Sequence, residues 1–547
     1  MDRETVISIL FSPWCIAVGT VTALYYYQTK NFTYWQNMGV PFQKPHLLFG
    51  NTGKRITFKI SYAEMLVELY QQFDGEKIAE YLRKNFHKPL SGIYEGRLPR
   101  LMIRDPELLR QVMVRDFDSF VDRAVISIHP NSYEENMMLS LRGSHWKAVR
   151  SVATPIFSSG KIKAMSHLVT KCADQISEYL DEYVIPKGGE VDAKELFGRF
   201  TLDVIGTCAF GVQCNSLQDP DAEFVRVISK FMEMSIWMRV RLFFSLLICG
   251  SATLARLMGV HFMNQETVRY IAGLVFNSKK ERVAQNSQRV DFLKLMFDAQ
   301  AGKLQKAAEQ SKELFEKDAQ LATAAAHEEK VPKTVLTDEM VVGQCLLFLL
   351  AGYDTSSTLL SFAAYELALN PEIQEKAREE VLAAVEKSDG ELSYDTLNDM
   401  PYLENVLMET LRRHPPVSRV ERSCTVPSYT IPGTSAVLKK GDIIMIPIRG
   451  LSLDPKHFPD PLKFNPDRFL PEERAKRSPY VFMPFGSGPR NCIGMRFAMM
   501  STRLAMATLL KSYKFETCPK TQVPYSISKG GILLKAKDGV WVKISRI

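Results

Sequence analysis

The 547-residue sequence lacks several patterns that identify common functional classes. Its nine cysteines are scattered, with no Cys-x-x-Cys pair and no zinc spacing, which argues against a disulfide framework and a zinc module. It contains no Gly-x-Gly-x-x-Gly fingerprint for a flavin or dinucleotide, and no internal repeat. No basic block with interleaved aromatics occurs, and a net charge of +8 suits an anionic membrane or an acidic redox partner better than nucleic acid.

The first feature that is present is an uncharged run from Val6 to Tyr27, about as long as a bilayer-spanning helix. The run ends in three tyrosines, and Lys30, Lys44 and Lys54 follow it, which by the positive-inside rule places the remaining chain in the cytoplasm. We therefore predict a membrane anchor over residues 1–30 and a catalytic domain over residues 31–547. The alternative is a cleaved signal peptide, which the missing basic leader disfavours.

A glycine-rich turn near the carboxyl end delivers a cysteine, Cys492, just before a predicted helix. Backbone N–H groups and the helix dipole favour a thiolate at such a position, so Cys492 is a candidate iron ligand. Gly486, Gly488 and Gly494 permit positive φ and a close approach to a flat cofactor. Arg490 could hold an anionic group of that cofactor.

A long apolar helix is predicted from Thr337, which is suited to its N-cap, to the stop at Asn370-Pro371. Within it, Ala351 and Thr355 share a face at a spacing of four residues, and the small Ala351 leaves room for a ligand. Asp354 is costly in so apolar a helix unless it has a partner or a task.

These features resemble the cytochrome P450 superfamily. The segment Phe485-x-x-Gly488-x-Arg490-x-Cys492-x-Gly494 is similar to its haem-binding signature. The chain most resembles the microsomal clan of liver drug-oxidising P450s, thromboxane synthase and arthropod detoxification P450s. The resemblance implies a mainly α fold with small β-sheets, the cytochrome P450 fold, with an N-terminal transmembrane anchor.

The resemblance also implies a haem b cofactor, with Cys492 as the axial ligand of its iron. The other residues that it assigns to cofactor binding are Arg490, Trp146, Arg150, Arg422, Arg123, Phe485, Gly486, Gly494 and Ala351. The arginines and Trp146 are matched to propionate contacts. A structural triad of Glu409, Arg412 and Arg468 is implied as support for the cysteine loop.

The implied activity is that of a monooxygenase, which inserts one atom of dioxygen into an apolar xenobiotic, steroid or lipid. Thr355 is assigned to dioxygen activation and Asp354 to proton delivery. Electrons are expected from NADPH through a separate NADPH–cytochrome P450 reductase, with cytochrome b5 as a further candidate donor. The expected location is the endoplasmic reticulum membrane, with the catalytic domain on the cytoplasmic side.

Two other functions remain open. One is a P450-fold isomerase or synthase that rearranges a peroxide without a reductase, as thromboxane synthase does. Members of that kind tend to replace the threonine, whereas this chain retains Thr355 beside Asp354. The other is a non-catalytic haem-binding sensor, which an intact Asp354–Thr355 pair disfavours.

Four further segments depart from the central motifs. Residues 39–45 resemble a proline-rich hinge, although an ordinary loop is nearly as good a reading. Residues 224–263 are expected to roof the substrate channel or to form an ordinary core helix pair. Residues 299–333 look inserted and weakly ordered, because they are rich in Ala, Gln, Glu and Lys. Substrate choice is expected in the 124–140 loop, the roof and near Phe348.

Overall fold

A computed structural model describes residues 13–72, 90–124, 128–231, 235–248, 250–285, 291–301 and 336–547. The predicted insertion at 299–333 begins at the end of helix α15, and its residues 302–333 lie outside this described part. So do residues 1–12 of the predicted anchor and residues 125–127 of the predicted substrate loop.

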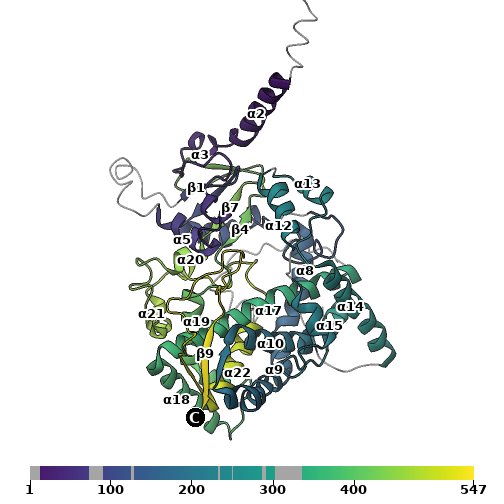
Figure 1. Ribbon diagram of the computed structural model, residues 1–547, viewed down its shortest axis with the longest axis vertical. Helices are drawn as coiled ribbons and strands as arrows, with labels where there is room; N and C mark the ends of the chain where they lie inside the picture. Colours follow the sequence, from purple (N-terminus) through teal and green to yellow (C-terminus); the bar gives the residue numbers. More distant parts are fainter. Residues whose placement is uncertain are drawn as a thin grey trace, which may run out of the picture.

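The described residues form a mainly helical body with small sheets (Figure 1). The longer helices are α2 (Pro13–Thr29), α5 (Tyr62–Gln72), α8 (Gly143–Ala153), α9 (Ser159–Tyr179), α10 (Ala193–Ile205), α14 (Gln265–Gln285), α15 (Phe292–Gln300), α17 (Asp338–Leu369), α18 (Pro371–Lys387), α19 (Pro401–Arg413) and α22 (Met495–Ser512). The short helices are α3 (Tyr34–Asn37), α4 (Gly53–Ile56), α7 (Pro106–Arg110), α11 (Glu223–Ser229), α12 (Ile236–Leu242), α13 (Ala252–Leu257), α20 (Ile448–Ser452) and α21 (Pro471–Ala475).

Three small sheets accompany the helices. The largest has the strand order β1-β2-β7-β4, in which β2 and β7 are parallel and the other pairs are antiparallel. A second has the order β3-β9-β8, and β5 pairs with β6 in a third. The strands are β1 (Leu90–Glu95), β2 (Leu98–Ile103), β3 (Glu190–Asp192), β4 (Val420–Ser423), β5 (Ser428–Thr430), β6 (Val437–Lys439), β7 (Ile443–Ile446), β8 (Tyr513–Glu516) and β9 (Trp541–Arg546).

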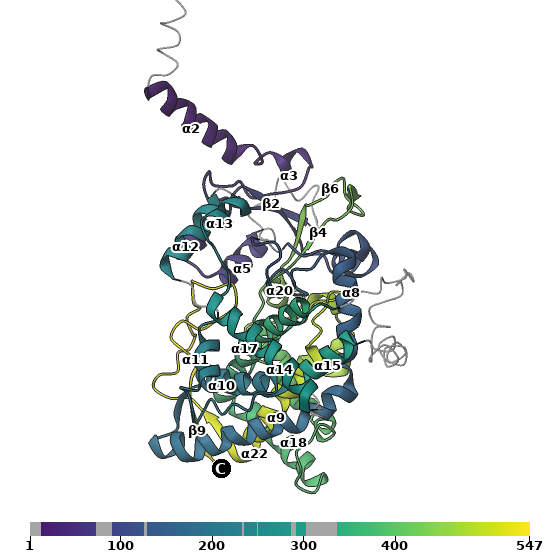
Figure 2. The same cartoon turned by 90° about the vertical axis from the view of Figure 1, so that its right-hand side faces the viewer.

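Helix α17 crosses the centre of the body in both views (Figures 1 and 2). The Thr337 hydroxyl accepts a hydrogen bond from the Met340 N–H group and so caps its start, and Pro371 begins the next helix. Its 32 residues span about 48 Å. The predicted bounds of this helix are therefore confirmed.

The main hydrophobic core surrounds α17 and includes side chains of α9, α10, α19 and α22. A second core lies between α5 and the largest sheet. Of the described residues, α17 alone is long and apolar enough to cross a bilayer, and 56% of its most apolar window is buried inside the molecule. A buried core helix passes the same test, so this finding does not show a membrane span.

Helix α2, the described part of the predicted anchor, projects from the end of the body beside α3 (Figures 1 and 2). Nearly all of its side chains are exposed, although they are apolar. Trp14 is 82% exposed, and Val18, Val21 and Leu24 are more than half exposed. Helices α12 and α13 lie at the same end of the molecule in both views.

Candidate functional site

The cysteine loop is folded back on itself by backbone hydrogen bonds. The Cys492 N–H group donates to the Phe485 carbonyl at 2.8 Å, and the Asn491 N–H group donates to the Gly488 carbonyl at 2.9 Å. Gly486 and Gly488 have φ values of +73° and +71°, so glycine suits both positions. At Gly488 a Cβ atom would lie 1.9 Å from the Met113 carbonyl oxygen.

The expectation of positive φ at Gly494 is wrong. Gly494 is the N-cap of α22 with a φ of −87°, and a Cβ atom there would have no neighbour nearer than 3.9 Å. Its backbone serves another purpose, because the Gly494 N–H group hydrogen-bonds the Cys492 sulfur and favours the thiolate. The backbone conformation at this position therefore does not require glycine.

Cys492 lies among cationic groups. Burial raises the pKa of its thiol, whereas the Gly494 N–H group, Arg150 and Arg123 act in the opposite direction. The Gly494 N–H group and the two guanidinium groups therefore favour the thiolate against the effect of burial, and a metal ion bound at the sulfur would complete its deprotonation.

Helix α8 brings Trp146 and Arg150 to the cysteine loop, as their spacing predicts. The Arg150 guanidinium donates to the Asn491 backbone oxygen at 3.1 Å and to its side-chain oxygen at 2.8 Å. The Arg490 guanidinium stacks 4.4 Å above the Trp146 ring. Arg490 also donates to the Leu141 carbonyl at 2.6 Å, and Arg123 donates to the Arg490 carbonyl at 3.0 Å.

Arg123 and Arg490 form a cluster with a third arginine, Arg422, and the nearest acidic influence on Arg490 is that of Asp122, with which it forms no ion pair among the described residues. Arg422, on β4, is 1% exposed and Arg490 is 2% exposed. The Nε atoms of all three are buried without a hydrogen bond, and none of the three forms an ion pair with a described residue. Burial, Arg123 and Arg490 together lower the pKa of Arg422 well below its usual range.

Buried cations of this kind are costly unless an anion neutralises them. A haem with its iron and two propionates fits this donor set, because Cys492 can bind the metal and the guanidinium groups, whose Nε atoms lack a partner, can bind carboxylates. The residues present therefore fit the cofactor that the sequence implies.

The opposite wall of the site is α17. Ala351 is exposed although it lies in the central helix, and Thr355 is half-buried one turn later. The Thr355 hydroxyl donates to the Ala351 carbonyl. The Phe348 ring, which is half-buried, contacts the rings of Phe157 and Phe292, and the selection of a substrate near it stays a prediction.

Asp354 has two partners that the sequence does not reveal. Its carboxylate oxygens lie 2.8 Å from the Nζ atom of Lys194 on α10 and 2.8 Å from that of Lys535 in the C-terminal segment. Lys194 also donates to the Ser357 and Thr358 hydroxyls. Burial raises the pKa of Asp354, but the two lysines outweigh it and lower that pKa overall. Asp354 is therefore a paired, ionised carboxylate.

The three members of the predicted structural triad lie together. Arg412 donates from Nε and from a terminal nitrogen to the two oxygens of Glu409, at 2.7 and 2.8 Å. The Nε atom of Arg468 lies 3.5 Å from the same carboxylate, and the Asn465 N–H group donates to it at 3.0 Å. Glu409 and Arg412 are fully buried. The cluster joins α19 to the segment ahead of the cysteine loop.

Known proteins are similar to this chain over nearly its whole length. The sequence model of the family described as Cytochrome P450 matches residues 63–542. The chain is 35% identical over 535 residues to "Probable cytochrome P450 6a14" of Drosophila melanogaster, covering 97% of this chain and 99% of the relative. It is 33% identical over 546 residues to "Cytochrome P450 9e2" of Blattella germanica, covering 97% of each chain. It is 32% identical over 528 residues to "Cytochrome P450 6k1" of the same species, covering 95% of this chain and 94% of the relative.

Proposed function

Because the chain belongs to the cytochrome P450 family and is a cytochrome P450 monooxygenase, we propose that it oxidises apolar organic substrates with electrons from NADPH, delivered by a separate reductase. The observation that carries the proposal is the cysteine loop bordered by buried, unpaired arginines, facing Ala351 and Thr355 on α17. When bound at Cys492, haem supplies the activation of dioxygen. The family match supports haem as the cofactor, and haem b is our specific proposal.

The residues around the cofactor divide the work by chemical type. Cys492 would bind the haem iron, and the Gly494 N–H group hydrogen-bonds its sulfur. Arg123, Arg422 and Arg490 would hold the propionates through charge-assisted hydrogen bonds. Two residues of α8 position the arginines and the cysteine loop. Trp146 stacks on Arg490, and Arg150 holds Asn491 beside the cysteine. Phe485 and Gly486 shape the loop, and Ala351 leaves space above it.

Thr355 and Asp354 supply the proton chemistry. The Thr355 hydroxyl is held by the Ala351 carbonyl and lies on the face of α17 that remains accessible. Asp354, the preceding residue, is linked to the surface through Lys535, whose side chain is 44% exposed. We propose that Asp354 relays protons from solvent to the Thr355 hydroxyl.

We also propose that residues 1–30 anchor the protein in the endoplasmic reticulum membrane, with residues 31–547 in the cytoplasm. The exposed apolar side chains of α2 support this placement, and so does Trp237 of α12, which is 72% exposed at the same end. Arg239 and Arg241 follow Trp237 in the same helix and suit anionic headgroups. The test is extraction of cell membranes with alkaline carbonate, which should release the chain lacking residues 1–30 but not the full chain.

Reconstitution tests the proposed reaction. Purified full-length chain in lipid, with reductase and dioxygen, should consume NADPH and hydroxylate members of a mixed steroid, fatty-acid and xenobiotic panel. Cytochrome b5 is added in a second arm as a candidate electron donor. NADPH-independent rearrangement of a hydroperoxide would instead show a P450-fold isomerase, and haem binding without turnover in any arm would show a sensor.

A further inference from the structure

The loop of residues 128–141 contacts residues 260–265, called the roof below, at one end and the cysteine loop at the other. Between these contacts it rests on α17. Because Gly343 has no side chain, the backbone of the loop can approach α17 closely. A Cβ atom at Gly343 would lie 2.9 Å from the Tyr133 carbonyl oxygen and 2.8 Å from the backbone carbon of Asn136. Backbone atoms cannot move aside as the end of a side chain can. The loop therefore packs on α17 at a point where any other residue would displace it.

The next residue, Gln344, binds the same loop through its side chain. Its amide nitrogen donates to the Asn136 carbonyl at 2.7 Å, and its amide oxygen accepts from the Met138 N–H group at 3.0 Å. The side chain is fully buried. A carboxylate could not donate to Asn136, and an apolar side chain would leave both loop groups unpaired, so the pairing requires an amide.

Beyond Gln344 the loop reaches an arginine of the cofactor site. The Met138 and Leu141 carbonyls accept hydrogen bonds from the two terminal nitrogens of Arg490, at 3.4 and 2.6 Å. The Met138 sulfur lies 4.0 Å from a terminal nitrogen of Arg150. The position of the loop on α17 therefore fixes the oxygens that orient Arg490.

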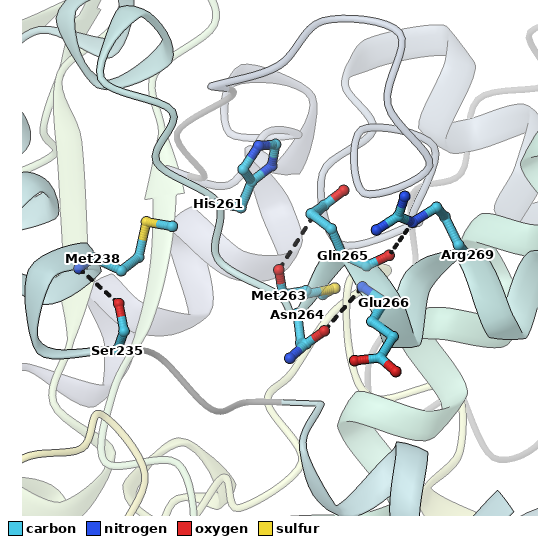
Figure 3. A pocket seen from close by; sticks show the side chains of 8 residues that line it. All are labelled: Ser235, Met238, His261, Met263, Asn264, Gln265, Glu266 and Arg269. Carbon is cyan, nitrogen blue, oxygen red and sulfur yellow. Dashed lines mark hydrogen bonds between the residues drawn. The ribbon is translucent and has the colours of Figure 1, made fainter. Parts of the chain in front are cut away.

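On the other side of Gln344 the loop is tied to the roof. The His129 Nε2–H group donates to the Val260 carbonyl at 2.8 Å, and the Gln265 amide donates to Glu134 at 3.0 Å. Gln265 also lines a cavity of about 360 Å³ at the start of α14, with Met238, Met263 and His261 around it (Figure 3). Two hydrogen bonds thus tie the loop to this part of the roof.

We propose that Gly343 and Gln344 form a dock that holds the 128–141 loop and couples the roof to Arg490. Gln344 is a positioning residue, because it acts on the cofactor site through the loop. The dock controls both how firmly the haem edge is held and how fast ligands pass the roof. The coupling to haem rests on the proposed function, in which Arg490 binds a propionate.

The test compares three variants of the haem-loaded full chain. Gln344→Met keeps the side-chain volume but removes all hydrogen bonds to the loop. Gly343→Ala adds a methyl group against the loop while favouring the helix, which keeps the test informative if the first variant folds poorly. Ser361→Ala is the matched control, because its buried hydroxyl lies on the same helix and bonds only to the Ser357 carbonyl.

Three measurements are made on each protein: hydrogen–deuterium exchange of peptides within 128–141, haem transfer to apomyoglobin, and stopped-flow dissociation of 4-phenylimidazole. In both dock variants we expect faster exchange of the loop and about tenfold faster haem transfer and dissociation, whereas Ser361→Ala should match the parent chain. A tenfold change corresponds to about 1.4 kcal/mol, within the cost of stranding a buried hydrogen-bonding group.

Two results would overturn the proposal. If exchange of the loop is unchanged in both dock variants, the dock does not hold it. If exchange rises but haem transfer and ligand dissociation stay at the parent rates, the loop is not coupled to Arg490. Failure of the parent chain to bind haem through a thiolate would instead refute the proposed function, and the exchange data would still report on the dock.

Discussion

Arg422 and Arg490 concentrate buried positive charge beside the cysteine loop. Arg422 is nearly inaccessible to solvent, and its side-chain hydrogen bond is to the Glu421 carbonyl at 2.9 Å. Its charged neighbours are Arg123 and Arg490, which repel it. An unpaired buried charge costs several kcal/mol, so the protein without cofactor bears a penalty that two propionates would remove.

This penalty gives Arg422→Met opposite effects on the two forms of the protein. The haem-free protein should gain about 1–3 kcal/mol in its free energy of unfolding, because a desolvated, repelled charge is removed. The haem-loaded protein should transfer haem to apomyoglobin about ten times faster, because a charge-assisted contact is lost. Urea unfolding and haem transfer measure the two effects.

A matched control for this variant is Arg503→Met, because Arg503 is paired with Glu404 at 3.0 Å. It should destabilise both forms alike. Equal destabilisation of both forms by Arg422→Met would refute a role for Arg422 in binding propionate.

Asp354 makes the stability of the fold depend on pH in the acid range. Burial raises its pKa, but Lys194 and Lys535 lower it further, so its folded-state pKa lies below the ordinary carboxyl value. A carboxyl group of this kind stabilises the fold fully above its unfolded pKa of about 3.9, and this stabilisation is lost as pH falls through the folded-state pKa.

Asp354→Asn should therefore lower the thermal midpoint at pH 7, because it leaves the partly exposed Lys194 and Lys535 without their shared counter-ion. The expected loss in the free energy of unfolding is about 1 kcal/mol, because solvent screens both lysines. The gap from the parent chain should stay constant from about pH 7 to pH 5 and close as the pH falls below about 4. Thermal melts across this range test the pairing, and a gap that is independent of pH down to the acid limit would contradict it.

Among the secondary-structure elements, α19 depends on the buried charges of Glu409 and Arg412. The two form a bidentate pair with no solvent access, and Arg468 approaches Glu409 at 3.5 Å without a hydrogen bond from its Nε atom. Arg412 is therefore the principal partner of Glu409, and Arg468 is secondary.

Arg412→Leu should lower the free energy of unfolding by about 3–5 kcal/mol, because Glu409 would remain buried without its main counter-ion. The double variant Glu409→Gln with Arg412→Leu should recover part of the loss, because no buried charge is then unpaired. Urea unfolding of both proteins is the measurement. A double variant no more stable than Arg412→Leu would show that packing, and not charge, accounts for the effect.

Local elements could be predicted from the sequence because their signals are local. The bounds of α17 follow from Thr337 and Pro371, and the turn at Gly486 and Gly488 follows from glycine spacing. The partners of Asp354 could not be predicted, because Lys194 lies 160 residues away and no motif marks it. Gln344 was missed for the same reason, since an amide in an apolar helix does not reveal which loop it binds.

At the scale of the whole molecule, the 128–141 loop lies between the end that carries exposed apolar side chains and the candidate cofactor site. Helices α2, α12 and α13 share one end, while α17 and the cysteine loop lie within the body (Figure 2). The 128–141 loop contacts both, because the His129 ring donates to the Val260 carbonyl just after α13 and the Met138 carbonyl accepts from Arg490.

The central claim is that this chain binds haem through the Cys492 thiolate. The most direct test is the absorption spectrum of the purified full chain, reduced and saturated with carbon monoxide, beside Cys492→Ser. We expect the parent chain to show the red-shifted band typical of a thiolate-ligated ferrous carbonyl and the variant to lack it. A parent chain that binds haem and folds, yet lacks this band, would contradict the central claim.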